Sequence, residues 1–458
     1  MGEALSAESR HGSVDYMSDE PWIELEEARA RSSNPTAVTL RYHREEVSSL
    51  ADVYQESGRV LGQGVSGEVL LAWGRHDGQK YALKRFDKRT MKAQSLKLLK
   101  REVEVYLSVD HPGIARLCDV YECPDSLTLV MECCTGGELF ERLLEQERCC
   151  LPEPEAAVAL QQMLHAVKYL HAHSVVHRDL KLENFLYESA EADAPLKLID
   201  FGFAKVWQPD MPLMHTCCGS IAYVSPDVLQ REGYTNKCDM WSLGVIAFML
   251  LAGYAPFSGA PRLMKQMIKA GDIDWGCQGK WHGVSQEACS FVRSLLTRDP
   301  EQRLDASAAL AHPWLIRMVP RPSAQPFLQP EVLASMRQYA LAPRLRQLAL
   351  QLVARELPPE ETLELRRLFL ALDADKTGTV CLSELEAAFR RQRVAGASES
   401  IWSYFSLWPS APATSEAAGR LLPAPASSAD AARREATEVF RALDCNGDGE
   451  AYASDFFA

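Results

Sequence analysis

The chain has 458 residues, of which 47% are hydrophobic and 24% are charged, so it is long enough for about two to four globular domains. Its formal net charge of −13 argues against nucleic acid as the main partner, because phosphate binding needs clustered lysines and arginines. No run approaches the roughly 18 apolar residues of a membrane span, and the 13 cysteines lack paired CxxC spacing, which favours reduced thiols over zinc sites or disulfides.

Residues 1–53 are predominantly polar, and a Ser-Ser-Asn-Pro run at 32–35 breaks their periodicity, which predicts a flexible leader. The first six residues fit the pattern for N-myristoylation at Gly2, although the acidic Glu3 disfavours acylation. A single acyl chain binds membranes only marginally. We therefore expect a cytoplasmic protein, with peripheral membrane association only if Gly2 is acylated.

Residues 54–130 alternate short apolar runs with glycines, which predicts strands, and a charged helix at 93–107 interrupts them. Residues 62–69 read Gly-Gln-Gly-Val-Ser-Gly-Glu-Val, and such glycines let a hairpin approach the phosphates of ATP. The glycines alone also fit a dinucleotide-binding turn, but the valine that follows them favours the phosphotransfer form. The residues expected to contact the nucleotide here are Leu61, Gly62, Gly64, Gly67 and Val69.

Lys84 ends a strand-like run at 81–84 and is the candidate for holding the α- and β-phosphates of ATP. Such a lysine needs a glutamate partner from the following helix. Glu102 fits this position best, and Glu104 remains the alternative.

Residues 177–184 read His-Arg-Asp-Leu-Lys-Leu-Glu-Asn and match the catalytic-loop pattern of phosphotransferases at every fixed position. Asp179 would accept the proton of the substrate hydroxyl, and Lys181 would neutralise charge on the transferring phosphoryl group. Asn184 and Asp200, the latter opening an Asp-Phe-Gly run, would bind Mg²⁺. The order and spacing of these elements predict phosphoryl transfer from ATP.

Together these motifs resemble the eukaryotic protein kinase family across about 54–315, which implies a two-lobed α+β fold with a β-rich and then an α-rich lobe. By that resemblance residues 132–134 form the hinge beside adenine, and 219–223 form the substrate-binding loop of a Ser/Thr kinase. The resemblance adds three residues to the expected nucleotide site: Glu132, Cys134 and Glu138.

Three further features follow from the same resemblance. Glu138 and Glu183 would favour arginine before the phosphorylated residue, unless both are simply solvated. Arg178 could receive a phosphate on Thr216 of the activation segment. Asp227 departs from the glutamate that the family has there, and its partner is expected to be a buried arginine, Arg303.

Residues 316–330 are rich in proline and arginine and predict a linker within a junction that extends to 357. A basic amphipathic helix near 338–354 then carries leucines at 341, 345, 348 and 352. Such a helix is typical of calmodulin targets. A helix that simply packs on the next domain explains the pattern equally well.

Residues 373–384 form a 12-residue EF-hand loop, with Gly378 at its sharp turn. Residues 444–455 form a second loop, which ends in an aspartate whose short side chain lowers calcium affinity. The expected ligands are Asp373, Asp375, Thr377, Thr379 and Glu384 in the first loop, and Asp444, Asn446, Asp448, Glu450 and Asp455 in the second.

The two loops begin at Asp373 and Asp444, which are 71 residues apart and therefore about twice the usual spacing. Either the second hand carries a long insertion, or a middle hand has decayed. Residues 395–432 are dominated by alanine, serine and proline, which predicts a disordered insertion inside an EF-hand domain at 358–458.

A kinase domain, a basic helix and EF-hands in this order resemble the calcium-dependent protein kinases of plants, apicomplexans and related protists. The resemblance implies ATP, Mg²⁺ and Ca²⁺ as cofactors, protein substrates with serine or threonine near basic residues, and an all-α EF-hand domain. It also implies that the junction helix occludes the substrate cleft until calcium makes the EF-hands bind it. The alternative function is a calcium sensor or scaffold with a weakly active kinase-like body.

Overall fold

The computed structural model describes most of the chain. The described residues are 22–23, 25–32, 35–44, 49–64, 67–216, 218–273, 275, 281, 283–319, 330–343, 345–347, 349–350, 365, 368–369, 371–374, 378–395, 428–444 and 449–452. Within these ranges no helix combines the length and apolar composition that crossing a membrane requires.

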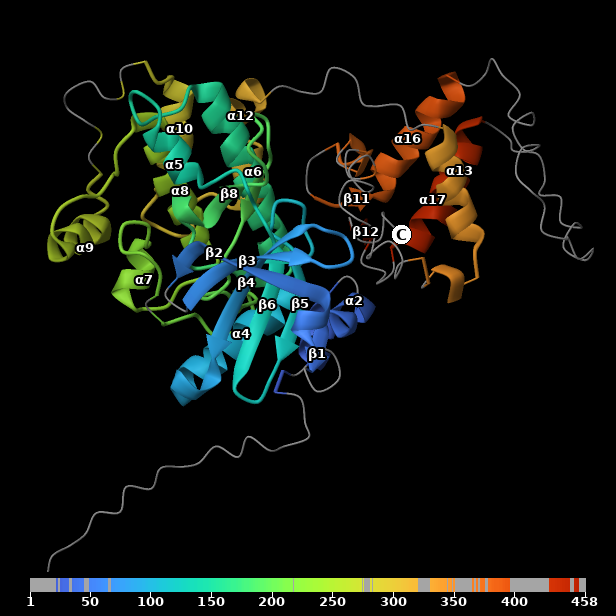
Figure 1. Ribbon diagram of the computed structural model, residues 1–458. Helices are drawn as coiled ribbons and strands as arrows, with labels where there is room; N and C mark the ends of the chain where they lie inside the picture. The colour runs from blue at the N-terminus through green and yellow to red at the C-terminus, as the bar shows by residue number, and fades with distance from the viewer. Residues whose placement is uncertain are drawn as a thin grey trace, which may run out of the picture.

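The small lobe is a twisted six-stranded sheet in the order β1-β5-β6-β4-β3-β2, with one long helix, α4, packed against it (Figure 1). The antiparallel pairing of β3 with β4 sets Val69 opposite Lys84, so the glycine-rich hairpin lies beside the predicted phosphate-binding lysine. The elements are α3 (Leu50–Val53), β2 (Tyr54–Gly64), β3 (Gly67–Gly74), β4 (Lys80–Asp87), the 3-10 turn Lys88–Thr90, α4 (Ala93–Ser108), β5 (Leu117–Glu122) and β6 (Ser126–Glu132).

The large lobe is helical and is built around α8, which is apolar on all sides and is buried from Cys238 to Phe248. Trp241 and Phe248 on this helix have no exposed surface. The helices are α5 (Leu139–Leu144), α6 (Glu153–Ala172), α7 (Pro226–Gln230), α8 (Lys237–Ala252), α9 (Pro261–Ala270), α10 (Gln286–Leu295), α11 (Ala306–Leu310) and α12 (Pro313–Met318). Two short pairs of strands lie on either side of the catalytic loop. β7 (Val175–Val176) pairs with β10 (Lys205–Val206), and β8 (Phe185–Tyr187) pairs with β9 (Leu196–Leu198). A 3-10 turn at Leu182–Asn184 leads directly into β8.

The prediction of a flexible leader over residues 1–53 is wrong for much of the segment from residue 22 onward. This part forms α1 (Leu25–Arg31), α2 (Pro35–Leu40) and β1 (Tyr42–Arg44), and β1 pairs in parallel with β5. Ile23, Ala28 and Val38 are completely buried against the small lobe. Tertiary contacts and the free edge of β5 therefore order a segment whose local sequence is polar.

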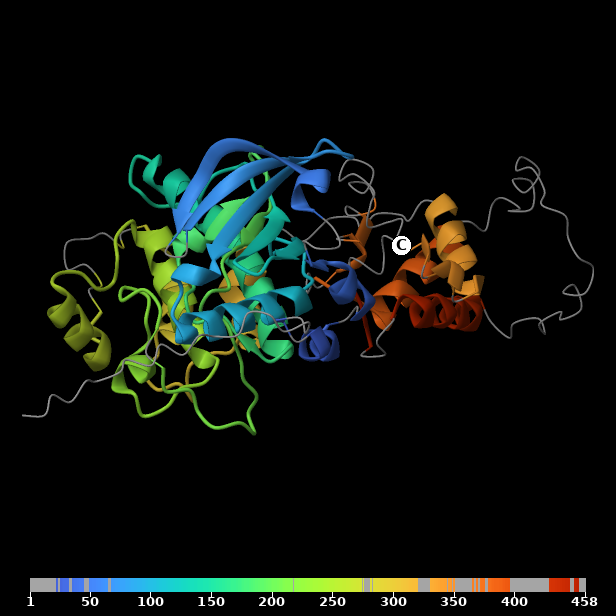
Figure 2. The same ribbon diagram turned by 60° about the horizontal axis from the view of Figure 1, so that its bottom comes forward.

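The C-terminal unit contains α13 (Pro330–Leu341), α16 (Leu382–Ala395) and α17 (Ser428–Leu443), with the short strands β11 (Val380–Cys381) and β12 (Glu450–Ala451). The three helices lie side by side in both views (Figures 1 and 2), and Arg337 of α13 forms an ion pair with Glu435 of α17. Leu333 and Met336 of α13 are buried with α16 and α17 in one apolar cluster.

Two predicted boundaries change. The first turn of α17 lies inside the insertion predicted at 395–432, and its Ala432 is buried. The helix that packs on the EF-hand unit runs from 330 to 341, earlier than the predicted 338–354, and a break at 342–343 follows it. Leu341 and Leu345, on either side of that break, are 82% and 80% exposed.

The burial pattern of α13 gives a stability prediction. Leu333→Ala should lower the free energy of local unfolding of the C-terminal unit by about 2–5 kcal/mol, because it leaves a cavity beneath a fully buried side chain. Hydrogen exchange of α16 and α17 amides measures this without assuming that the whole chain unfolds as one unit. Leu341→Ala, on the same helix and exposed, is the control and should change little. Equal effects from both variants would contradict the packing of α13.

Candidate active site and calcium loops

The ammonium of Lys84 lies between two carboxylates. Its Nζ is 3.2 Å from Oε1 of Glu102 on α4 and 3.1 Å from Oδ1 of Asp200 in the Asp-Phe-Gly run. The structure therefore brings Glu102 to the lysine, as predicted over the alternative Glu104.

The protonation of this cluster follows from burial and charge. Burial lowers the pKa of Lys84, but the carboxylates of Glu102 and Asp200 reverse the effect and hold it above its ordinary value. Burial likewise opposes ionisation of Asp200, yet the neighbouring ammonium of Lys84 keeps the pKa of Asp200 below its ordinary value. Lys84 stays cationic and Asp200 stays anionic near neutral pH, which are the forms needed for binding phosphate and a divalent cation.

Helix α4 contributes a second contact to the same site. Tyr106, one turn after Glu102, stacks on Phe201 with ring centroids 4.7 Å apart. Phe201 is fully buried and also meets His177 edge-to-face at 5.3 Å. The position of α4 thus determines where both the lysine partner and the aromatic ring of the Asp-Phe-Gly run lie.

The predicted catalytic Asp179 is held by three groups. Its Oδ1 accepts hydrogen bonds from the backbone N–H and hydroxyl of Ser220, at 2.8 and 3.0 Å. Its Oδ2 is 3.2 Å from Nζ of Lys181. Sequence reasoning placed residue 220 only in the substrate-binding loop, so its contact with the catalytic carboxylate was missed. These contacts fix the orientation of the Asp179 carboxylate.

The donor set next to Asp179 fits a divalent cation. The amide nitrogen of Asn184 donates to the backbone carbonyl of Asp179 at 2.8 Å, which leaves the amide oxygen of Asn184 as an acceptor. Asp200 has a left-handed φ of 63°, an uncommon conformation for a non-glycine residue, and its side chain is 42% exposed. Asn184 and Asp200 are the residues that would hold Mg²⁺, which takes oxygen ligands.

A buried carboxylate beneath the catalytic loop was not predicted as part of the site. Asp239, at the start of α8, accepts backbone N–H bonds from His177 and Arg178 at 2.9 and 2.8 Å. It also pairs with Nε2 of His171 at 2.9 Å. Arg178 has a φ of 67°, so these bonds hold a strained turn in place. The local sequence places Asp239 at the start of an apolar helix but does not indicate which backbone groups it binds.

The remaining nucleotide-site predictions map onto the small lobe and the hinge. Gly67 has φ 131°, and a Cβ there would lie 3.1 Å from the carbonyl oxygen of Arg85, so the hairpin needs glycine at this point. The side chain of Glu132 forms an ion pair with the buried Lys197 at 2.9 Å. The other residues predicted to contact the nucleotide, Leu61, Gly62, Gly64, Val69 and Cys134, lie on β2, on β3 or directly after β6.

Two acidic residues near the catalytic loop share one electrostatic environment. Burial and the carboxylates of Glu141 and Glu183 raise the pKa of Glu138. Glu183 in turn accepts a hydrogen bond from the hydroxyl of Tyr223 at 3.4 Å. The carboxylates of Glu138 and Glu183 repel one another, so a cation between them would be stabilised.

The activation segment is tied to the catalytic loop through Tyr234. The guanidinium of Arg178 donates to the carbonyl of Phe203 at 2.6 Å and to the hydroxyl of Tyr234 at 3.2 Å. That hydroxyl in turn donates to the carbonyl of Thr216 at 2.7 Å. Thr216 itself is exposed. The arginine predicted to receive a phosphate therefore already contacts the segment through neutral groups.

Asp227 and Arg303 form the predicted buried pair. Nη2 of Arg303 is 2.8 Å from Oδ1 of Asp227, and the arginine is only 1% exposed. The second oxygen, Oδ2, is buried and has no hydrogen bond within the described part of the chain. A glutamate would reach about one methylene further, so the aspartate satisfies only half of a bidentate pair.

The two predicted calcium loops share one turn geometry. Gly378 and Gly449, both at loop position 6, have φ of 83° and 87°. Their N–H groups donate to the first aspartates, Asp373 and Asp444, at 2.7 and 3.0 Å. In the first loop, Oε1 of Glu384 accepts the N–H of residue 374 at 2.7 Å, so the last carboxylate reaches the start of the loop. The described part of each loop thus has the first carboxylate and the glycine turn of an EF-hand, and by itself it forms no cluster of three acidic, histidine or cysteine ligands.

The two loops pair directly with each other. β11 and β12 are antiparallel, with Val380 opposite Ala451, which are both at loop position 8. This pairing favours an insertion within one hand pair over a decayed middle hand. The predicted ligands Asp375, Thr377, Asn446, Asp448 and Asp455 lie outside the described residues; Thr379 and Glu450 are described.

The C-terminal unit touches the large lobe through the second loop. Tyr452, directly after β12, is 1% exposed, and its hydroxyl is 2.8 Å from Nε2 of His173 at the end of α6. Its ring meets Tyr169 edge-to-face at 6.2 Å. Gly378 of the first loop lies against His111, since a Cβ there would be 2.0 Å from Nε2 of that histidine.

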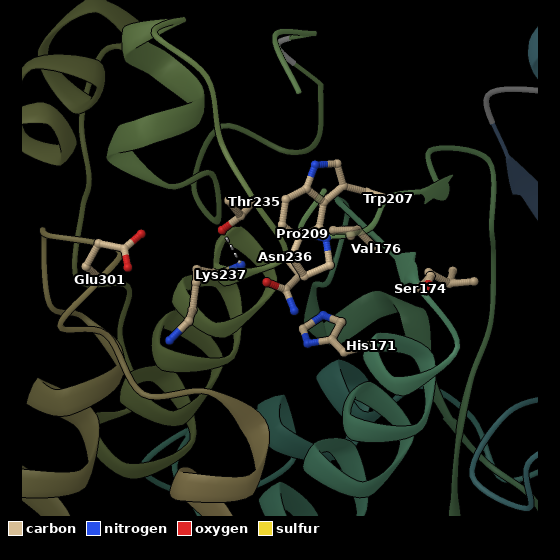
Figure 3. A pocket seen from close by; sticks show the side chains of 10 residues that line it. His171, Ser174, Val176, Trp207, Pro209, Thr235, Asn236, Lys237 and Glu301 are labelled. Atoms are coloured by element: carbon tan, nitrogen blue, oxygen red, sulfur yellow. Dashed lines mark hydrogen bonds between the residues drawn. The ribbon is translucent and has the colours of Figure 1, made fainter. Parts of the chain in front are cut away.

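A separate hollow lies behind the catalytic loop, between β7 and the start of α8 (Figure 3). His171, Asn236 and Trp207 point into it, and none of the residues predicted to bind phosphate or metal lines it. His171 pairs with Asp239, so this hollow lies next to the carboxylate that holds the catalytic loop.

Comparison with known proteins agrees with this geometry. The family described as "Protein kinase domain" matches residues 55–315. Calcium-dependent protein kinase 1 of Arabidopsis thaliana is 35% identical over 73% of this chain and 54% of its own length. Calcium-dependent protein kinase 9 of Oryza sativa subsp. japonica is 38% identical over 74% of this chain and 58% of its own. Calcium/calmodulin-dependent protein kinase type 1B of Homo sapiens is 38% identical over 60% of this chain and 78% of its own. The chain thus spans little more than half the length of the first of these relatives.

The half-satisfied Asp227 pair gives a second stability prediction. Asp227→Ala should destabilise the large lobe by about 3–5 kcal/mol, because it leaves a buried arginine without its charge partner. Asp227→Glu should stabilise it by about 1 kcal/mol, since the second carboxylate oxygen gains a donor. The measurement is hydrogen exchange of α8 amides, or the denaturant midpoint if the large lobe unfolds in a separate transition. A Glu variant less stable than the natural chain would show that the helices are already too close for the longer side chain.

Proposed function

The chain belongs to the protein kinase family and, within it, to the calcium-dependent protein kinases, so we propose that it transfers the γ-phosphate of ATP to serine or threonine under calcium control. The observation that carries the proposal is Lys84 held between Glu102 and Asp200, beside an Asp179 already oriented by Ser220.

Each residue of this chain has a defined task in the proposed reaction. Lys84 holds the α- and β-phosphates, Asn184 and Asp200 bind the cation, and Asp179 accepts the proton of the attacking hydroxyl. Bound Mg²⁺ would neutralise the charge of the transferred group. Lys181, 3.2 Å from Asp179, adds a second positive charge on the same side.

A basic peptide is the proposed substrate class. Glu138 carries a pKa raised by burial and by the carboxylates of Glu141 and Glu183, so an arginine side chain between these groups would relieve their repulsion. Tyr223 keeps Glu183 next to the substrate-binding loop at 219–223. These contacts support a preference for arginine near the phosphorylated residue.

Calcium control is supported by two sets of contacts. The two loops pair through β11 and β12 and each has a glycine turn at position 6, and α13 lies against their helices through Leu333 and Met336. Tyr452, next to the second loop, contacts the large lobe at His173. We propose that calcium acts on catalysis through both contacts: the capture of the junction helix and the contact at Tyr452.

The test is transfer of phosphate from ATP to a peptide with arginine before its serine, with calcium and with a calcium chelator. Transfer should require Mg²⁺ and rise with calcium.

Asp179→Asn should reduce the rate by about 10²–10⁴-fold, because it removes the proton acceptor. Glu384→Gln should keep the calcium-independent rate and raise the calcium concentration needed for activation, since it weakens the bidentate ligand. No transfer in either condition would contradict kinase activity; equal transfer in both would leave the kinase and remove the calcium control.

The contact at Tyr452 can be tested separately. Tyr452→Ala should lower the calcium-activated rate while titration calorimetry still finds the natural number of calcium sites. Tyr452→Phe keeps the ring and loses only the hydroxyl contact with His173, so it should have a smaller effect, of about 0.5–1.5 kcal/mol in coupling. If Tyr452→Ala responded to calcium like the natural chain, this contact would have no part in calcium regulation.

A further inference from the structure

The segment before the matched family domain covers a part of the molecule on which catalysis depends. We call residues 22–44 the N-terminal strap; residues 24, 33 and 34 of this range lie outside the described residues. The family match begins only at residue 55. Within the strap, α1 packs on α4 and on α2, and β1 lies beside β5.

The strap is attached to the small lobe at three kinds of contact. Ile23, Ala28 and Val38 have no exposed surface and share one apolar cluster with Leu99 and Val103 of α4. The main chain joins the sheet, since the carbonyl of residue 41 accepts the N–H of residue 120 at 2.7 Å. These two contacts fix the strap to the helix and to the sheet edge at once.

Polar and aromatic contacts complete the attachment. Nε2 of His43 is 2.9 Å from Oδ1 of Asp119, and its ring stacks on Tyr121 at 4.8 Å. At the other end, the ring of Trp22 lies 5.1 Å from the ammonium of the buried Lys88. Terminal segments that are not attached to a domain are poorly ordered and lack buried contacts of this kind.

Helix α4 lacks the local features that would fix it by itself. Its N-cap is Lys92, whose side chain makes no capping hydrogen bond, and its first turn carries no acidic residue. A helix of this length therefore depends on tertiary packing for its position. One face of α4 carries Glu102 and Tyr106 toward the active site.

We propose that the N-terminal strap positions α4, and through it the Glu102–Lys84 pair and the Tyr106–Phe201 stack, for phosphoryl transfer. The strap residues act through α4 and touch no substrate, so they are positioning residues. The proposal deepens the kinase function proposed above and rests on it for its kinetic readout. Its structural readout, the local stability of α4, is independent of activity.

The main variant is Ile23→Ala in the full chain, which removes most of a fully buried side chain just before α1. It should lower kcat/KM for ATP at least about tenfold, because Lys84 loses its fixed partner, and leave the KM for the peptide within about twofold. Hydrogen exchange should speed up in α4 and stay unchanged in α8. Ile23→Val, which keeps most of the side chain, should restore both values. Trp22→Ala, at the neighbouring residue, is the second variant and removes the contact with Lys88.

Glu27→Ala is the matched control. It lies on α1 within the strap, its side chain is 61% exposed, and it forms a surface ion pair with Arg31 at 3.3 Å. It should change neither kinetics nor exchange.

The proposal would be overturned if Ile23→Ala and Trp22→Ala both kept the α4 hydrogen exchange and the kcat/KM for ATP of the natural chain. Equal acceleration in α4 and α8 would also overturn it, since the strap would then stabilise the chain generally. If the natural chain transfers no phosphate under any condition, the proposed function fails, and the exchange of α4 still decides the role of the strap.

Discussion

The ammonium of Lys84, buried between the carboxylates of Glu102 and Asp200, is the interaction on which the rest of the site depends. Its partners are 18 and 116 residues away in the sequence, so one cation joins β4, α4 and the Asp-Phe-Gly run. Losing either carboxylate would leave a buried charge poorly compensated, which is costly. The arrangement is therefore stable only when α4 is in place, and the position of one helix becomes a condition for catalysis.

The residues that handle phosphate could be predicted because their chemistry restricts both residue type and spacing. Lys84, Asp179, Asn184 and Asp200 lie where the motifs indicated. The sequence favoured Glu102 on α4 and left Glu104 as the alternative. Two residues turn a helix by about 200°, so only one of them can face Lys84, and the structure places Glu102 there. A local sequence motif is sufficient to predict such residues when the chemistry itself requires that motif.

What could not be predicted consists of contacts between distant segments made by ordinary residue types. Ser220 and Asp239 hold the catalytic loop, yet each is a common polar residue whose role depends on its partner. Residues 22–44 read as a polar leader, because a few buried side chains separated by charges give no periodic signal. The EF-hand loops were recognised singly, whereas the pairing of Val380 with Ala451 across a long insertion became clear only in the fold.

The two parts of the chain that flank the kinase domain approach α4 from different directions. The N-terminal strap packs on the helix itself, through the cluster that includes Val103. The calcium loops lie against the turn that follows it, because Tyr452 contacts Tyr169, whose hydroxyl accepts the N–H of Asp110 at 2.8 Å. Coupling between two sites requires an element whose position both can bias. In this chain the strap and the paired loops both contact α4 or the turn that follows it, so this helix is the element through which the two proposed effects would reach the Lys84–Glu102 pair.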